Sequence, residues 1–405
     1  MKNRKSMAMF LAAALAAASL AGCSSGSDTA STAQETAKET QKEAGAAPAA
    51  AGTETFRLGL VCPLSGSSAV SGAILQNAVQ MAVDEINKEG GIGGSVPIEL
   101  YCEDDEATPA TSVTVMQKLV EQEGVNTVIG SQPSSCTLAN MEITEAAKIP
   151  QITPASSNIT VTQQGNDYIY RMTSTDATNA KTLLKYAQSI GYKTIAILNE
   201  SSDFGVGGGK ILEDLAGDYG ITVADHEVYN AGDTDFTAII GKADAAKVDC
   251  FFIWGYHTET AAIMSQMQLY GYDYPVIGYG MNSPELTVLG GDAVEGICIC
   301  TSFDAANPDE ATQAFDSKYK ALFGTSYDQN GPQSYDAVYL IADAVERAMA
   351  DGADWKDGET LNSYIASADY TGVTGNTSFD ETGEMIKDLM IITIENGEHK
   401  IVDWN

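Results

Sequence analysis

The sequence predicts an α/β fold made of two Rossmann-like lobes, each built on a parallel sheet. Short apolar runs typical of buried strands alternate with longer segments that have helical periodicity. The alternation restarts after Arg171 and so forms two halves of similar size. The stretch from Phe56 to Asn405 holds roughly 350 residues, more than a single core usually organises, and two lobes are therefore expected.

The first half opens with an apolar strand at 56–62 and a helix at 72–88 that Gly90 and Gly91 stop. A strand follows at 96–101. Thr108 and Pro109 then resemble an N-cap and first helical residue. The elements expected after this point are a helix to residue 120, a strand at 126–130, a helix at 137–148 and a strand at 150–153.

The second half repeats the pattern with four strands and four helices. The helices are expected at 177–190, 207–219, 236–246 and 259–270, and the strands at 194–198, 221–229, 250–254 and 275–277. Parallel sheets of this kind bind ligands beyond the carboxyl ends of their strands. Two such lobes facing each other would form a cleft, and hinged closure would trap a ligand in it.

The N-terminus has the features of a targeting segment. A positively charged start precedes an apolar run at 7–20, and the sequence LAGC at 20–23 resembles a bacterial lipobox. We therefore predict a signal peptide at 1–22 and a lipidated Cys23 as the mature N-terminus; the alternative is an ordinary signal peptide with a chance cysteine. The rest of residues 23–54 is polar and lacks aromatic side chains, which predicts a disordered tether.

Charge and cysteine usage exclude several classes of protein. The formal net charge of -33 should repel nucleic acid and anionic lipid surfaces, so the lipid is the expected membrane contact. Besides Cys23 there are six cysteines, too few in so long a chain for a disulfide scaffold. Cys62 and Cys102, near the ends of two neighbouring strands, are the best candidates for a disulfide.

The sequence contains no recognisable motif for catalysis or cofactor binding. The glycine-rich run at 205–211 lacks the spacing and the final Ser or Thr of a phosphate loop and is interpreted as a turn that opens a helix. The three histidines lie far apart in sequence, and no nucleophile–base pair or metal constellation is recognisable. The acidic run at 103–106 could bind a cation, but a solvated turn is the favoured interpretation. We expect no enzyme, no metal and no cofactor.

Several motifs together resemble those of the leucine/isoleucine/valine-binding proteins. They are LAGC at 20–23, VCPLSG at 61–66, DEINKEGGI at 84–92, EDD at 103–105, VIGS at 128–131, ITPASSN at 152–158, DFG at 203–205 and SYDAV at 334–338. The resemblance implies a type I periplasmic-binding fold with a three-strand hinge near residues 171, 301–304 and 387–390. It also implies one lobe made of 55–171 and 303–388, and a second made of 172–302 and a last strand within 389–405.

The same resemblance implies the ligand site. Ser134, with Ser135 beside it, the backbone of Ala155, and Ser157 would hold the α-carboxylate of the ligand. The residues themselves agree, because two serines just before a helix offer free N–H groups and a positive dipole end. The resemblance further implies that Phe204 and Tyr256 cover the ligand and that Ser71 occupies a cleft-wall position.

The sequence departs from the family at the site for the ligand's ammonium group. The loop at 278–282 carries no acid, whereas the family usually places one there. Tyr279 offers only a hydroxyl or a ring face. Either another acid, Asp203 or Glu259, reaches the ligand, or the ligand is not an α-amino acid but a small carboxylate or an amide.

These features predict an extracytoplasmic, lipid-anchored solute-binding subunit of an ABC importer. Its ligand would be a branched-chain amino acid or a related small amino-acid-like or carboxylate molecule, and its partners an ABC permease and ATPase. A ligand sensor that signals through a membrane partner is the alternative. We expect no catalytic residue in either case.

Overall fold

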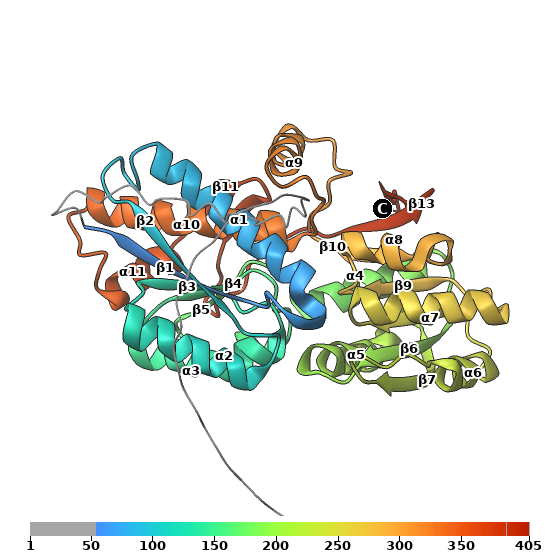
Figure 1. Ribbon diagram of the computed structural model, residues 1–405. Coiled ribbons are helices and arrows are strands. Elements are labelled where there is room, and N and C mark those ends of the chain that lie inside the picture. The colour runs from blue at the N-terminus through green and yellow to red at the C-terminus, as the bar shows by residue number, and fades with distance from the viewer. Residues whose placement is uncertain (1–53, 386, 405) are drawn as a thin grey trace, which may run out of the picture. The chain divides into compact units, whose positions relative to one another are not determined.

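The computed structural model describes residues 54–385 and 387–404, which carry two large α/β sheets (Figure 1). The signal peptide, Cys23 and most of the tether predicted above lie outside the described residues. Within the described part of the chain, no helix has the length and apolar character needed to cross a membrane.

The first sheet has five parallel strands in the order β2-β1-β3-β4-β5. The strands are β1 (Phe56–Cys62), β2 (Ile98–Asp104), β3 (Thr127–Ile129), β4 (Gln151–Thr153) and β5 (Ile169–Arg171). Helices α1 (Ala69–Lys88), α2 (Pro109–Lys118) and α3 (Ser134–Ala147) connect them. The strand order reverses between β1 and β3, so a crevice is expected beyond the carboxyl ends of these two strands.

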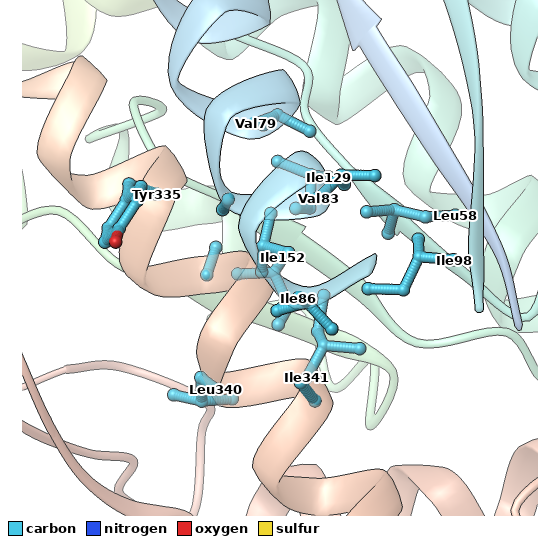
Figure 2. Packing of buried hydrophobic residues seen from close by; sticks show 14 of the residues in the cluster. Leu58, Val79, Val83, Ile86, Ile98, Ile129, Ile152, Tyr335, Leu340 and Ile341 are labelled. Carbon is cyan, nitrogen blue, oxygen red and sulfur yellow. The ribbon is translucent and has the colours of Figure 1, made fainter. Parts of the chain in front are cut away.

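A helix from late in the chain completes the core of this first lobe. Helix α10 (Asn330–Ala350) packs against α1 over one face of the sheet (Figure 2). The buried side chains in this layer include Leu58, Val79, Val83, Ile86, Ile98, Ile129, Ile152, Leu340 and Ile341. Each such side chain contributes about 1.5–3 kcal/mol on burial, so the layer fixes α10 and the loop that precedes it.

The second sheet has seven strands in the order β14-β13-β10-β9-β8-β6-β7. Its parallel part consists of β6 (Thr194–Glu200), β7 (Thr222–Tyr229), β8 (Cys250–Trp254), β9 (Val276–Tyr279) and β10 (Cys298–Thr301). The helices are α4 (Asp176–Ser189), α5 (Asp203–Ala216), α6 (Thr237–Ala245), α7 (His257–Tyr270) and α8 (Pro284–Gly290). Helices α4 and α5 pack on one face and α6, α7 and α8 on the other. The order reverses between β6 and β8, which gives a second crevice.

The chain passes between the two sheets three times: after β5, after β10 and before β13. The segment that returns to the first lobe holds α9 (Glu310–Phe323), α10, α11 (Gly358–Ala366) and a small hairpin of β11 (Asp369–Gly372) and β12 (Gly375–Ser378). Arg171, at the end of β5, pairs with Glu384 in an isolated bridge. This arrangement is the type I periplasmic-binding architecture, and the predicted fold class is confirmed.

The end of the chain differs from the single last strand that was expected. Two strands, β13 (Met390–Glu395) and β14 (Glu398–Ile401), extend the second sheet in antiparallel fashion, so this sheet is mixed. Asn396 and Gly397 join them, both with positive φ (54° and 76°). An Asn-Gly pair with this backbone favours a tight hairpin, and that signal was present in the sequence.

Several predicted boundaries are wrong, although the strands at 56–62 and 250–254 match. Helix α5 begins at Asp203, so the glycine-rich run lies inside the helix and is not a turn before it. A Cβ on Gly208 would lie 2.0 Å from the indole nitrogen of Trp254 on β8. The glycine therefore allows α5 to pack closely on the sheet.

Cys62 and Cys102, the best candidates for a disulfide, are free thiols in the structure. In the register of β1 and β2, Cys102 pairs with Leu60, and Cys62 pairs with Asp104, so the two cysteines are diagonal neighbours on parallel strands.

Candidate functional site

A cavity lies where the carboxyl ends of strands from both sheets meet. Segments that follow β1, β3 and β4 line it from the first sheet, and segments at the ends of β6, β8 and β9 line it from the second. The lining residues are Ser71, Gln132, Ser134, Ala155, Ser157, Phe204, Tyr256, His257, Tyr279, Gly280, Asn282, Ser283, Cys300, Asp328, Gln329 and Asn330. The cavity therefore joins the crevices at the two switch points of strand order.

Seven of the eight predicted ligand-binding residues line this cavity. They are Ser71, Ser134, Ala155, Ser157, Phe204, Tyr256 and Tyr279. The eighth, Ser135, lines an adjacent pocket of about 620 Å³ together with Glu200, Ser202 and Glu259. Consecutive residues at a helix start point in different directions, which separates Ser135 from its neighbour.

Ser134 was expected just before a helix, but it is the first residue of α3. The N-cap is Pro133, and no side chain caps this helix, so a capping role for the serines is wrong. Because the first N–H groups of a helix have no intrahelical acceptor, Ser134 and Ser135 still offer free donors and a positive dipole end. The hydroxyl of Ser134 accepts a hydrogen bond of 3.4 Å from the N–H of Asn158. The serine and the loop after β4 are thus in direct contact.

Arg171 holds the loop after β4 in place through hydrogen bonds to its backbone. Its guanidinium is fully buried. Nη1 donates to the carbonyl oxygens of Ser156 (2.6 Å) and Asn158 (3.0 Å), and Nη2 donates to Oγ1 of Thr162 (2.8 Å). Three donors in a rigid fork fix the backbone on both sides of Ser157. Sequence reasoning placed a lobe crossing at this arginine but gave it no role in the site.

The hydroxyl of Ser157 is buried and has no hydrogen-bond partner in the described structure. The N–H of Ala155, in contrast, donates to Oγ1 of Thr153 at 3.4 Å, which leaves mainly its carbonyl oxygen for a ligand. The loop therefore presents a donor at Ser157 and an acceptor at Ala155.

Three aromatic rings form one wall of the cavity. The ring of Phe204 lies 5.1 Å from that of Tyr256 and 6.0 Å from that of Tyr279, measured between centroids. Tyr279 is the last residue of β9, so the predicted strand end at 277 and the predicted loop position of this tyrosine are both wrong. Burial raises the pKa of the Tyr279 and Tyr256 hydroxyls, which keeps both neutral.

An acid that sequence reasoning missed lies next to Ser157. Asp176, the first residue of α4, is fully buried, and neither of its carboxylate oxygens has a hydrogen-bond partner among the described residues. Its N–H donates to the carbonyl oxygen of Ser157 at 2.8 Å. Burial raises the pKa of this carboxyl to about 7, although the hydroxyl of Ser157 and the charge of Arg171 act in the opposite direction. Burying this acid without a hydrogen-bond partner is costly, and the charge of the nearby Arg171 offsets that cost only in part.

The acids proposed from sequence do not fill this role. Asp203 is exposed in the first turn of α5 and lines neither pocket. Asp176 does not line a pocket either, but it is buried against Ser157, which lines the cavity. Glu259 lines the adjacent pocket, where Oε1 accepts a 2.8 Å hydrogen bond from the N–H of Gly232. The sequence signal for Asp176 was weak, because an acid at a helix start is usually a solvated partner of the helix dipole.

The acidic run at 103–106 is only partly a solvated turn. Asp105 is fully buried and accepts hydrogen bonds from the N–H of Ala107 (3.1 Å) and the hydroxyl of Ser112 (3.3 Å). Glu103 forms an ion pair with Lys118 at 2.6 Å. In the described part of the chain, no group of three or more His, Cys, Asp or Glu residues could hold a metal ion.

The sequence profile described as periplasmic binding protein matches residues 55–398. Among curated relatives, the leucine-, isoleucine-, valine-, threonine-, and alanine-binding protein of Pseudomonas aeruginosa is 31% identical over 367 residues, which is 89% of this chain and 93% of the relative. The match therefore extends over nearly the whole length of both proteins.

Solved structures agree with this match. The branched-chain amino acid transporter substrate binding protein LivJ of Streptococcus pneumoniae, in complex with isoleucine, has a TM-score of 0.79 and 29% identity and covers 86% of this chain and 99% of its own. The leucine binding protein LivK of Thermotoga maritima has a TM-score of 0.79 and 26% identity, with 86% and 98% covered. The likeness therefore covers most of this chain and nearly the whole of both solved structures.

Proposed function

Because the chain belongs to the periplasmic binding protein family, we propose that it is the extracytoplasmic binding subunit of an ABC importer for α-amino acids. The relatives described above bind leucine or isoleucine according to their names, and importers of this class take their solute from such a subunit. The permease and the ATPase are the partners that this proposal requires.

The choice of an α-amino acid as the ligand rests on one observation. The cavity holds donors for an anion, at Ser134 and Ser157, and directly behind Ser157 lies the buried and unpaired carboxylate of Asp176. An α-carboxylate would accept from the serine hydroxyls and from the free N–H groups of α3. The ammonium group would donate to the carbonyl oxygen of Ala155 and lie near the charge of Asp176 behind the wall, while Phe204, Tyr256 and Tyr279 cover the ligand. Ser71 completes the cavity wall.

This assignment replaces the conclusion drawn from the loop at 278–282. That loop lacks an acid, but a counter-charge for the ammonium lies on the other side of the cavity wall in α4. A carboxylate without an ammonium group would satisfy the serines and leave Asp176 unpaired. An α-amino acid is therefore favoured over a simple carboxylate.

The proposal includes attachment to the membrane through Cys23. The lipobox-like sequence at 20–23 supports this, and the polar residues up to 54 would let the folded part move above the membrane surface. Both features belong to residues outside the described structure.

Calorimetry on the purified protein tests the function. We expect at least one common α-amino acid to bind with micromolar or tighter affinity, and its deaminated analogue to bind at least tenfold more weakly, because a charge-assisted hydrogen bond contributes about 1.5–3 kcal/mol. Equal affinity for an amino acid and its deaminated analogue would contradict the role of Asp176. Binding of neither would contradict the proposed function.

A further inference from the structure

The wall of the cavity is polar where a leucine or valine side chain would need an apolar surface. None of the residues that line it in the described structure is Leu, Ile, Val or Met. Apart from the serines and aromatic residues already assigned, the wall contains Gln132, His257, Asn282, Asp328 and Asn330. An aliphatic side chain in this cavity would exclude water from these polar groups and leave the unsatisfied ones among them, such as Oε1 of Gln132, without a partner.

Gln132 offers an acceptor that nothing in the described structure uses. The residue follows β3 and is only 7% exposed. Its Oε1 atom is buried and has no hydrogen-bond donor. A buried amide oxygen of this kind is destabilising unless a ligand or an ordered water donates to it.

Asp328, in the loop before α10, offers a second acceptor. It is 5% exposed. Oδ1 accepts a 2.9 Å hydrogen bond from the N–H of Asn330, as in the start of a helix, while no Lys, Arg or His forms an ion pair with the carboxylate among residues 54–385 and 387–404. The bond from Asn330 uses one carboxylate oxygen and leaves the second one for another donor.

The wall contains no positive charge that would balance these acceptors. His257 is its only basic side chain in the described structure, and burial lowers the pKa of this imidazole. Nε2 of His257 already pairs with Oε2 of Glu285 at 3.0 Å. An acidic ligand side chain would therefore meet the Asp328 carboxylate and an amide oxygen without a compensating cation.

We propose that the solute is an α-amino acid whose side chain carries N–H donors, as a side-chain amide or a cationic nitrogen, which Gln132 and Asp328 accept. This inference rests on the proposed function, since it takes the serines and Asp176 to bind the α-carboxylate and α-ammonium groups. Leucine, isoleucine and valine are then expected to bind weakly, although the names of the relatives described above say that those proteins bind amino acids of this kind.

Isothermal calorimetry with the purified protein compares glutamine and asparagine, lysine and arginine, glutamate, and the three branched-chain amino acids. We expect at least one nitrogen-bearing side chain to bind tenfold or more tightly than leucine, isoleucine and valine. Branched-chain affinities equal to or tighter than all the others would overturn the inference and leave the proposed function standing. Failure of every α-amino acid to bind would remove both.

Two substitutions test the assigned residues. Gln132→Leu should weaken binding of the preferred nitrogen-bearing ligand at least tenfold and strengthen that of leucine. Asp328→Asn keeps the oxygen that accepts from Asn330, and so it distinguishes the two ligand chemistries: it should weaken a cationic ligand at least tenfold and an amide ligand less than threefold.

Asp357→Asn is the matched control, because Asp357 is the exposed N-cap of α11 and accepts a 2.9 Å hydrogen bond from the N–H of Thr360. It should leave all affinities unchanged. If Gln132→Leu weakened every amino acid by the same factor, the residue would have only a structural role, and the inference would be wrong.

Discussion

The N–H of Asp176 donates a hydrogen bond of 2.8 Å to the carbonyl oxygen of Ser157. Ser157 belongs to the loop after β4 of the first sheet, and Asp176 begins the first helix of the second lobe. The bond therefore fixes the hydroxyl that would hold a carboxylate next to the acid that would hold an ammonium group. Ser157 and Asp176, at the crossing between the lobes, would thus match the spacing between the carboxylate and ammonium groups of the ligand.

Replacing the buried acid should remove affinity for the ammonium group. Asp176→Asn is expected to weaken α-amino acid binding by about 10- to 150-fold, which corresponds to about 1.5–3 kcal/mol for a charge-assisted hydrogen bond. Calorimetry measures the change. Asp203→Asn is the matched control, since Asp203 occupies the same first-turn position of α5 but is exposed. An unchanged affinity in Asp176→Asn would exclude the acid from the site.

The same substitution should change how stability depends on pH. The pKa of Asp176 is about 7 in the folded protein and about 3.9 in an unfolded chain, so the folded state retains a proton that the unfolded state releases between these values. This residue therefore makes the ligand-free protein less stable as pH rises from about 4 to about 7. Asp176→Asn removes the effect.

Urea unfolding of the two ligand-free proteins at pH 4 and pH 8 measures that difference. The variant should be more stable than wild type at pH 8, by at most about 4 kcal/mol, and nearly equal to it at pH 4. A variant that is less stable by the same amount at both values would show that the carboxylate is not strained by burial.

The donors of the anion site should contribute together. Ser134→Ala combined with Ser157→Ala is expected to weaken ligand binding by about 1–3 kcal/mol, because the ligand carboxylate loses two hydroxyl donors. The folded structure should be nearly unchanged, since Ser157 Oγ has no partner among the described residues and Ser134 Oγ accepts only a long hydrogen bond of 3.4 Å from the N–H of Asn158. Ser363→Ala, on α11, is the control. Calorimetry that finds equal affinity in the double variant would remove both serines from the site.

Arg171 should affect both stability and binding. Arg171→Lys keeps the charge but cannot reproduce three directed hydrogen bonds to the loop that carries Ser157. We expect a loss of about 3–5 kcal/mol in the free energy of unfolding and weaker binding at temperatures where the variant is folded. Urea denaturation and calorimetry at low temperature separate the two effects. A fully stable variant would show that the loop holds its shape without the guanidinium.

Attachment to the membrane depends on Cys23 in our proposal. In cells that process lipoproteins, Cys23→Ser should move the protein from the membrane fraction to the soluble extracytoplasmic fraction, because the serine lacks the thiol that carries the lipid. Fractionation and mass spectrometry of the N-terminus measure the outcome. A wild-type protein that is soluble and carries no lipid would contradict the proposal.

Patterns that depend on neighbours in sequence were predicted well. The apolar runs that form β1 and β8 have the predicted bounds, and the alternation of strands and helices led to the correct fold class. Local periodicity and the geometry of parallel sheets suffice for these features. The resemblance to the leucine/isoleucine/valine-binding proteins placed Ser134 and Ser157 near a ligand, and the structure brings both to the same cavity.

Features that depend on distant contacts were missed or wrong. The register of β1 and β2 sets Cys62 and Cys102 diagonally, and no local signal gives a register. From the sequence, Asp176 is interpreted as a solvated acid at a helix start, whereas the packing of the loop after β4 buries it. The polar wall of Gln132 and Asp328 comes from segments almost 200 positions apart that only α10, packed on the first sheet, brings together. The sequence by itself determined the elements and their order, because these follow from local periodicity. Only the tertiary structure decided which charges lack water and partners, because burial is a property of the packed chain.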